Sequence, residues 1–188
     1  MKAGHFRTSF LGLAASLAVI SGIGMAQAAE PANTMIIELK SGKVEIELLP
    51  KLAPQHVARV KRLIRDGFYN DVVFHRVMSG FMAQTGDRTG TGSGGSELPD
   101  LPAEFSSYVY KRGTLGAARS NSPNSANSQF FICFNDEGCR GLTKQYTVFG
   151  QVISGMEHVD RIKAGAPGSG TVTDPDRMLK VYMANEKK

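Results

Sequence analysis

Two segments of the chain carry side chains that could act together on a peptide group. The first runs from Phe74 to Asp87 and the second from Ser120 to Ile132. Together they contain an arginine, two side-chain amides and several large apolar residues, which can hold a peptide backbone and enclose a ring. No strong nucleophile, metal cluster or phosphate-binding loop accompanies them. This composition suits a site that rotates a bond without breaking one.

Period-two alternation predicts that these groups converge on one groove. Along a strand, Phe74, Arg76 and Met78 would share a face, and so would Gln129 and Phe131. An arginine in such a run is more often an exposed edge residue. The residues that follow it favour a functional interpretation, and they are Phe81, Met82 and Gln84. We therefore interpret Arg76 as a candidate functional residue.

Two alternative chemistries are disfavoured. The segment Gly90–Gly95 matches the dinucleotide-binding pattern, but Pro99 and Pro102 prevent the helix that this motif requires. A flexible loop is the better interpretation. His75 could act as a general base, yet no carboxylate is placed by sequence to orient it, and no Gly-x-Ser-x-Gly elbow is present. Neither a nucleotide-binding protein nor a hydrolase is expected.

The elements that must position these residues are mostly short strands. Residues 35–48 alternate on both sides of Ser41-Gly42 and predict a hairpin with one polar face. Pro54 begins a helix that Gly67 ends, and a second helix is predicted over residues 156–163. Many strands with only two helices favour an antiparallel barrel or sandwich. The further predicted strands cover residues 72–77, 81–84, 113–117, 129–133, 147–152 and 178–183.

The N-terminus has the pattern of an export signal. Lys2 and Arg7 precede an apolar run over residues 10–25, and Ala26-Gln27-Ala28 supplies the small residues of a cleavage site. The run is shorter than the ~20 apolar residues that a membrane span needs, although a retained anchor is the alternative. We predict a signal peptide over residues 1–28, a single domain over residues 29–188 and a periplasmic location.

Charge and cysteine content limit the possible partners. Removal of Lys2 and Arg7 with the leader lowers the formal charge from +5 to +3. The remaining basic residues gather only mildly and lack interleaved aromatic residues, so no nucleic-acid partner is expected.

The spacing of Cys133 and Cys139 matches no metal-binding motif. A disulfide is permitted in an oxidising compartment, but a buried Cys133 with a separate Cys139 on a loop is favoured.

The two segments resemble the active-site signature of the cyclophilins, a family of peptidyl-prolyl cis–trans isomerases. The resemblance extends from Met35 to about Val181 and is closest to bacterial members with export leaders. It implies a mainly β fold, a closed eight-stranded antiparallel barrel capped by two α-helices. It also implies a monomeric enzyme that accelerates rotation about X–Pro bonds in unfolded or folding exported proteins, with no cofactor, metal or membrane span after leader removal.

Carried over position by position, the resemblance assigns roles to residues of both segments. Arg76 would be the catalytic arginine, assisted by Gln84 and Phe131. Gln84 would also bind the substrate backbone, as would Gln129, and His75 would be structural or peripheral. The other positions that would bind the substrate are Phe81, Met82, Gly92, Ser120, Leu142 and Tyr146.

The chain departs from the family pattern beside Leu142. An aromatic residue, Trp or in bacteria Phe, often precedes that position, whereas this chain has no tryptophan and has Cys139-Arg140-Gly141 there. The resemblance therefore implies weak binding of cyclosporin, which depends on that aromatic residue. A disulfide between Cys133 and Cys139 would fix the loop in its place. The alternative function is a proline-peptide binding module or chaperone with little turnover, which would not need Arg76.

Overall fold

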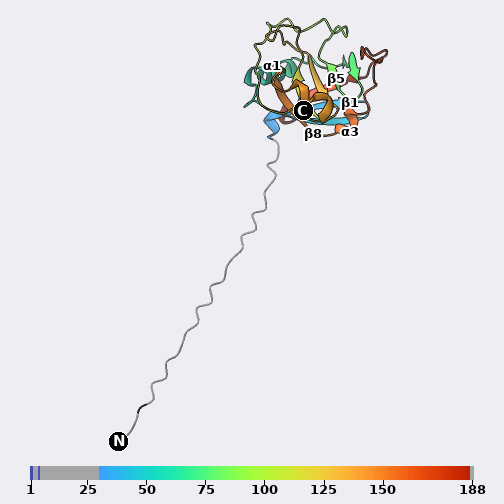
Figure 1. Ribbon diagram of the computed structural model, residues 1–188. Coiled ribbons are helices and arrows are strands. Elements are labelled where there is room, and N and C mark those ends of the chain that lie inside the picture. The colour runs from blue at the N-terminus through green and yellow to red at the C-terminus, as the bar shows by residue number, and fades with distance from the viewer. Residues whose placement is uncertain (2–3, 5–29, 187–188) are drawn as a thin grey trace.

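An eight-stranded antiparallel sheet dominates the computed structural model, which describes residues 1, 4 and 30–186. The strand order is β10-β1-β2-β8-β6-β7-β5-β4, and the sheet curls around the main apolar core (Figure 1). Apart from residues 1 and 4, the predicted signal peptide lies outside the described residues. The strands of this sheet are β1 (Thr34–Leu39), β2 (Gly42–Leu48), β4 (Arg76–Met78), β5 (Met82–Thr85), β6 (Thr114–Ala117), β7 (Phe130–Cys133), β8 (Val148–Ser154) and β10 (Lys180–Met183).

The predicted N-terminal hairpin is confirmed. β1 and β2 pair from Thr34 opposite Glu47 to Leu39 opposite Gly42. In β2 the residues at alternate positions, Val44, Ile46 and Leu48, are buried, as the apolar alternation in the sequence indicates. The hairpin continues the sheet on both sides, because β1 also pairs with β10 and β2 with β8.

The barrel is not closed, which corrects the expectation of a closed eight-stranded barrel. Within residues 30–186 no ladder joins the edge strands β4 and β10, and a separate two-stranded sheet pairs β3 (Val72–Val73) with β9 (Arg177–Met178). The segment 165–171 covers the open edge of β4 instead. The N–H of Val77 donates to the carbonyl oxygen of Gly170, and the N–H of Gly165 donates to that of Val77. The predicted strand over residues 72–77 is divided because Val72 and Val73 pair with β9, whereas β4 pairs with β5 in the main sheet.

Side chains of the central strands alternate between the core and an outer groove. One line of residues in register crosses β4, β5, β7 and β6, and it consists of Val77, Ala83, Ile132 and Leu115 in that order. All of them are buried in the main core. The residues next to them along each strand must therefore point out of the core, toward the groove described below.

Two of the helices correspond to the two that the sequence predicts. α1 (Pro54–Arg65) packs against β10, and its first turn begins at proline, as expected. α3 covers only Met156–Val159, because the chain then continues in turns in which the N–H of Lys163 donates to the carboxylate of Asp176. A short helix, α2 (Asp136–Cys139), was not predicted, and single turns of 3₁₀ helix lie at Pro31–Asn33, Arg140–Leu142 and Ala184–Glu186.

The described residues contain neither a candidate membrane span nor a candidate metal site. None of their helices is both long enough and apolar enough to cross a bilayer. Their histidine, cysteine and acidic side chains form no group of three suited to holding a metal ion.

Candidate functional site

One line of residues across the central strands carries the predicted chemistry. Arg76 on β4 lies opposite Gln84 on β5, and Gln84 lies opposite Phe131 on β7. Phe131 in turn lies opposite Gly116 on β6. These residues are the neighbours of the core line described above, so their side chains meet on the outer face of the sheet. The sheet register therefore brings together residues from two distant parts of the sequence.

Several acceptors hold the guanidinium of Arg76. Its Nη1 donates to Oε1 of Gln84 at 3.2 Å, and its Nε donates to the carbonyl oxygen of Ser169 at 3.2 Å. Its Nη2 lies 2.9 Å from the sulfur of Met78. Arg76 forms no ion pair within residues 30–186. The half-buried guanidinium therefore offers a positive charge that no carboxylate neutralises.

A small cavity with an apolar floor lies beside Arg76. Its volume is about 190 Å³. The floor consists of Phe131 and Met82, which are 5% and 1% exposed. Phe131 stacks on Tyr110 with ring centroids 5.9 Å apart and meets Tyr146 edge-on at 5.7 Å. The lining residues are Arg76, Phe81, Met82, Gln84, Ala118, Arg119, Phe131, Leu142 and Tyr146.

Gly116 makes this aromatic packing possible. A Cβ at position 116 would overlap both the ring of Phe131 and the hydroxyl of Tyr110. Only a glycine on β6 lets the two rings lie this close to the sheet. The floor of the cavity is therefore set by a strand that contributes no side chain to it.

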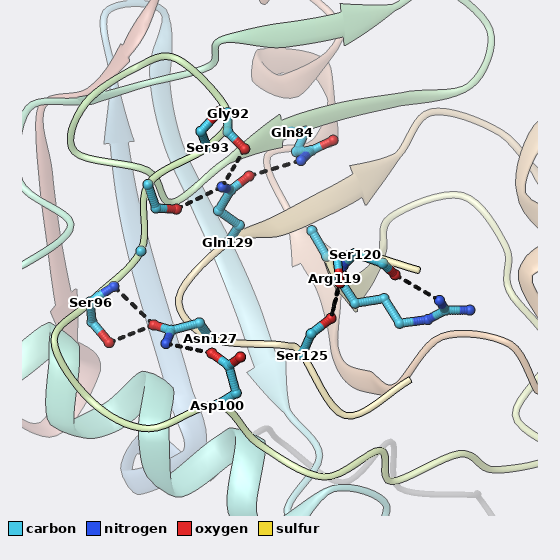
Figure 2. A pocket seen from close by; sticks show the side chains of 13 residues that line it. Gln84, Gly92, Ser93, Ser96, Asp100, Arg119, Ser120, Ser125, Asn127 and Gln129 are labelled. Carbon is cyan, nitrogen blue, oxygen red and sulfur yellow. Dashed lines mark hydrogen bonds between the residues drawn. The ribbon is translucent and has the colours of Figure 1, made fainter. Parts of the chain in front are cut away.

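A second cavity of about 480 Å³ adjoins the first and shares Gln84, Ala118 and Arg119 with it. Figure 2 shows how Gln129 links its walls: Oε1 accepts from Nε2 of Gln84 at 2.9 Å, and Nε2 donates to the carbonyl oxygen of Gly92, also at 2.9 Å. Gly92, Ser120 and Gln129 line this second cavity. Every site residue predicted from the sequence thus lies in one cavity or the other.

Cys133 and Cys139 form a disulfide in the apolar cluster that also contains Met82 and Phe131. Cys133 shares its strand face with Phe131, and Cys139 ends α2; both are fully buried, in one apolar cluster with Phe131. The favoured prediction of two separate cysteines is therefore wrong, and the alternative prediction of a disulfide is confirmed. The bridge ties the loop that precedes Leu142 to β7. Asn135 also fastens this loop, since its Nδ2 donates to the carbonyl oxygen of Gly80 at 2.8 Å.

His75 lies outside both cavities. It is only 7% exposed, and neither ring nitrogen has a hydrogen-bond partner among the described residues. Burial lowers the pKa of His75, and the charge of Asp87 opposes this effect. The imidazole is therefore neutral near pH 7. It is not placed to exchange a proton with a ligand in the groove.

Sequence reasoning missed Ala118, Arg119 and Tyr110. Arg119 lines both cavities, and its guanidinium carbon lies 4.5 Å from the centre of the Tyr146 ring. Its position next to Ser120, which the sequence does predict, is a signal that could have identified it. Tyr110 belongs to no predicted element, so no signal in the sequence points to its place beneath Phe131.

Comparisons with known proteins identify the family. The sequence model described as cyclophilin type peptidyl-prolyl cis-trans isomerase/CLD matches residues 34–183, and this chain belongs to that family. A probable peptidyl-prolyl cis-trans isomerase of Brucella suis is 50% identical over 196 residues, covering 97% of this chain and 99% of that protein. The rat peptidyl-prolyl cis-trans isomerase-like 3 is 40% identical over 126 residues, covering 65% of this chain and 76% of its own.

Solved cyclophilins share the fold. A cyclophilin from Hirschia baltica superposes with a TM-score of 0.72 at 26% identity, covering 85% of this chain and 77% of its own. A cyclophilin-type isomerase of Cryptosporidium parvum, crystallised in the presence of the dipeptide Ala-Pro, gives a TM-score of 0.72 at 27% identity. That match covers 80% of this chain and 98% of the other. The similarity supports a curled antiparallel sheet with a few helices.

Proposed function

We propose that this cyclophilin rotates X–Pro bonds in unfolded or folding proteins, with Arg76 as the catalytic residue. One observation carries the proposal: the Arg76 guanidinium lies at the edge of a cavity with an apolar floor, oriented by Gln84. A proline ring that fills this cavity would place its nitrogen next to the guanidinium. The enzyme is proposed to act as a monomer.

The rate enhancement would come from binding the twisted amide better than the planar one. Amide resonance sets an uncatalysed barrier of about 18–20 kcal/mol. As the bond twists, the prolyl nitrogen becomes pyramidal and regains a lone pair, to which Arg76 donates a hydrogen bond. The planar ground state scarcely offers this acceptor, so the interaction favours the transition state. The apolar floor strengthens it by excluding water from one side.

The side-chain amides would hold the substrate backbone on one side of the rotating bond. Gln84 uses only one N–H of its Nε2 within the described residues, in the bond to Gln129. The second N–H remains for a substrate carbonyl. Restraining one side lets the proline and the residues beyond it rotate as a unit, which lowers the entropy lost in reaching the transition state.

The test is a protease-coupled isomerisation assay on an X-Pro peptide, comparing the mature protein with Arg76→Ala. Loss of a charge-assisted hydrogen bond of ~2–4 kcal/mol predicts a fall in kcat/KM of roughly thirty- to a thousandfold. Arg161→Ala, an exposed arginine outside the groove, is the matched control and should keep its activity. Full activity of Arg76→Ala would show that the arginine is not the catalytic group. An inactive mature protein that still binds the peptide would favour a binding module.

We also propose that the enzyme works outside the cytoplasm. The support is the sequence pattern of Lys2 and Arg7, an apolar run and Ala26-Gln27-Ala28. Mass spectrometry of the protein from its native cells should find a mature N-terminus near Ala29 or Glu30. An intact leader on soluble protein outside the cytoplasm would contradict cleavage, and recovery from the cytoplasm alone would contradict export.

A further inference from the structure

Asp87 is a buried carboxylate that the proposed mechanism does not use. It is 0% exposed and forms no ion pair within residues 30–186. Its Oδ1 accepts from the N–H and the hydroxyl of Thr89, both at 2.8 Å. Its Oδ2 accepts from the N–H groups of Gly92 at 2.7 Å and Gly94 at 3.1 Å. A buried charge satisfied only by one loop holds that loop in a single conformation.

The same two glycines hold Gln129. The carbonyl oxygens of Gly92 and Gly94 accept the two N–H groups of Gln129 Nε2, at 2.9 and 2.8 Å. Each glycine therefore has its N–H on Asp87 and its carbonyl on Gln129. Because both amide hydrogens of Gln129 face the loop, its Oε1 must face Gln84.

This orientation continues to the guanidinium. Oε1 of Gln129 accepts from Nε2 of Gln84, which leaves Oε1 of Gln84 to accept from Nη1 of Arg76. If either amide were turned over, Arg76 would face an NH₂ group, and a donor would oppose a donor. The carbonyl oxygens of Gly92 and Gly94 therefore determine the orientation of the Gln84 amide, and with it the atom of Gln84 that faces Arg76.

We propose that Asp87 is a positioning residue for Arg76, acting through the loop 87–95 and the amides of Gln129 and Gln84. The inference rests on the catalytic role proposed for Arg76. Gly94 fits this function, since a Cβ there would overlap the Asp87 carboxylate. Any larger residue at position 94 would therefore displace the Asp87 carboxylate from the loop.

Asp87→Asn is the direct test, because it keeps the size of the side chain and replaces one acceptor oxygen with a donor. We expect kcat/KM in the isomerisation assay to fall about five- to fiftyfold, mostly through kcat, with peptide affinity changed less. Asp66→Asn, which makes the same change on an exposed carboxylate of the α1 terminus, should be fully active. Arg76→Ala is assayed alongside. If Arg76→Ala is impaired while Asp87→Asn is not, the inference fails and the proposed function stands.

A double-variant cycle separates positioning from general damage. If Asp87 acts through Gln129, then Asp87→Asn should cost less than about twofold in a Gln129→Ala background. The same fold-loss in both backgrounds would overturn the proposal. Near-UV circular dichroism checks folding. Should Asp87→Asn not fold, Thr89→Val and Gly94→Ala disturb the same contacts and are judged by the same cycle.

Discussion

Arg119 and Tyr146 are joined across the outer wall of the smaller cavity. The guanidinium carbon lies 4.5 Å from the ring centre, and Nε and Nη2 donate to the carbonyl oxygen of Gln145 at 3.2 and 3.1 Å. Tyr146 in turn meets Phe131 edge-on. One arginine thus connects the end of β6 to the loop that holds the aromatic wall.

Replacing Arg119 should loosen this wall. We expect Arg119→Met, which keeps the aliphatic stem but loses the charge, to weaken peptide binding about two- to thirtyfold, from a cation–π interaction of ~0.5–2 kcal/mol. The effect should appear in peptide affinity and KM, with kcat nearly unchanged, because Arg119 has no part in the proposed twisting step. Isothermal titration with an X-Pro peptide measures it. Unchanged affinity would show that Tyr146 keeps its position without the arginine.

The disulfide should be present in the mature protein and should stabilise it. Thiol titration of unfolded, unreduced protein should detect no free thiol, and two free thiols would contradict the bridge. The double variant Cys133→Ala/Cys139→Ala should lose about 2 kcal/mol of unfolding free energy, as expected for closing such a short loop. Urea denaturation measures this loss. The reduced natural protein is the control, because it lacks the bridge but keeps both cysteine side chains and so has no cavity in their place.

Cyclosporin should bind weakly to the natural chain and more tightly to Gly141→Trp. A Cβ at Gly141 meets nothing within 4 Å, so there is room for a large side chain before Leu142. An interfacial aromatic residue is typically worth ~2 kcal/mol, or about thirtyfold in affinity. Gly141→Ala is the matched control. Nanomolar binding by the natural chain would show that another residue replaces the missing aromatic.

Acid should destabilise the protein through His56 and Glu104. The ring nitrogen Nδ1 of His56 lies 2.6 Å from Oε2 of Glu104, whereas the buried Nε2 has no partner among the described residues. Burial lowers the pKa of His56, although Glu104 opposes the shift. Burial alone would raise the pKa of Glu104, but hydrogen bonds from His56 and Gln55 lower it.

Both shifts have the same sign. As the pH falls below about 7, the unfolded state takes up a proton at position 56 before the folded state does. The unfolding free energy should therefore decrease on acidification, by at most about 1.4 kcal/mol per pH unit for one histidine. His56→Asn retains a donor toward Glu104 and should flatten this slope, leaving the part due to His75. Urea denaturation between pH 7 and 5 measures it, and an unchanged slope would exclude His56 as the cause.

The sequence predicted the groove because its residues obey local rules. Alternation grouped Arg76 with Met78 correctly, because both lie on the groove side of β4, and Arg76 belongs to the line that the sheet register assembles. It was wrong for Phe74, which lies in the main core because the strand is interrupted at residues 74–75. What alternation cannot provide is the register between strands distant in sequence. The pairing of Gln84 with Phe131 emerges only when β5 and β7 meet in space.

The misses have a common physical cause. Closure of the barrel was expected, but the hydrogen bonds of Val77 to Gly165 and Gly170 depend on a loop with no periodic pattern. Tyr110 likewise lies in an irregular segment and becomes part of the site through ring packing alone. The disulfide depended on the path of a six-residue separation through α2, whose four residues are too few to show a helical period.

The loop that covers the edge of β4 also limits how the extended chains that the enzyme acts on can pair with its sheet. Unfolded chains are extended and carry unpaired backbone groups, and an exposed strand edge would recruit them into an intermolecular sheet. Val77 has both its N–H and its carbonyl occupied by Gly170 and Gly165, so this edge offers no template at that position. At Val77, therefore, the edge of the sheet cannot add a strand from an extended chain, whereas the neighbouring groove remains open.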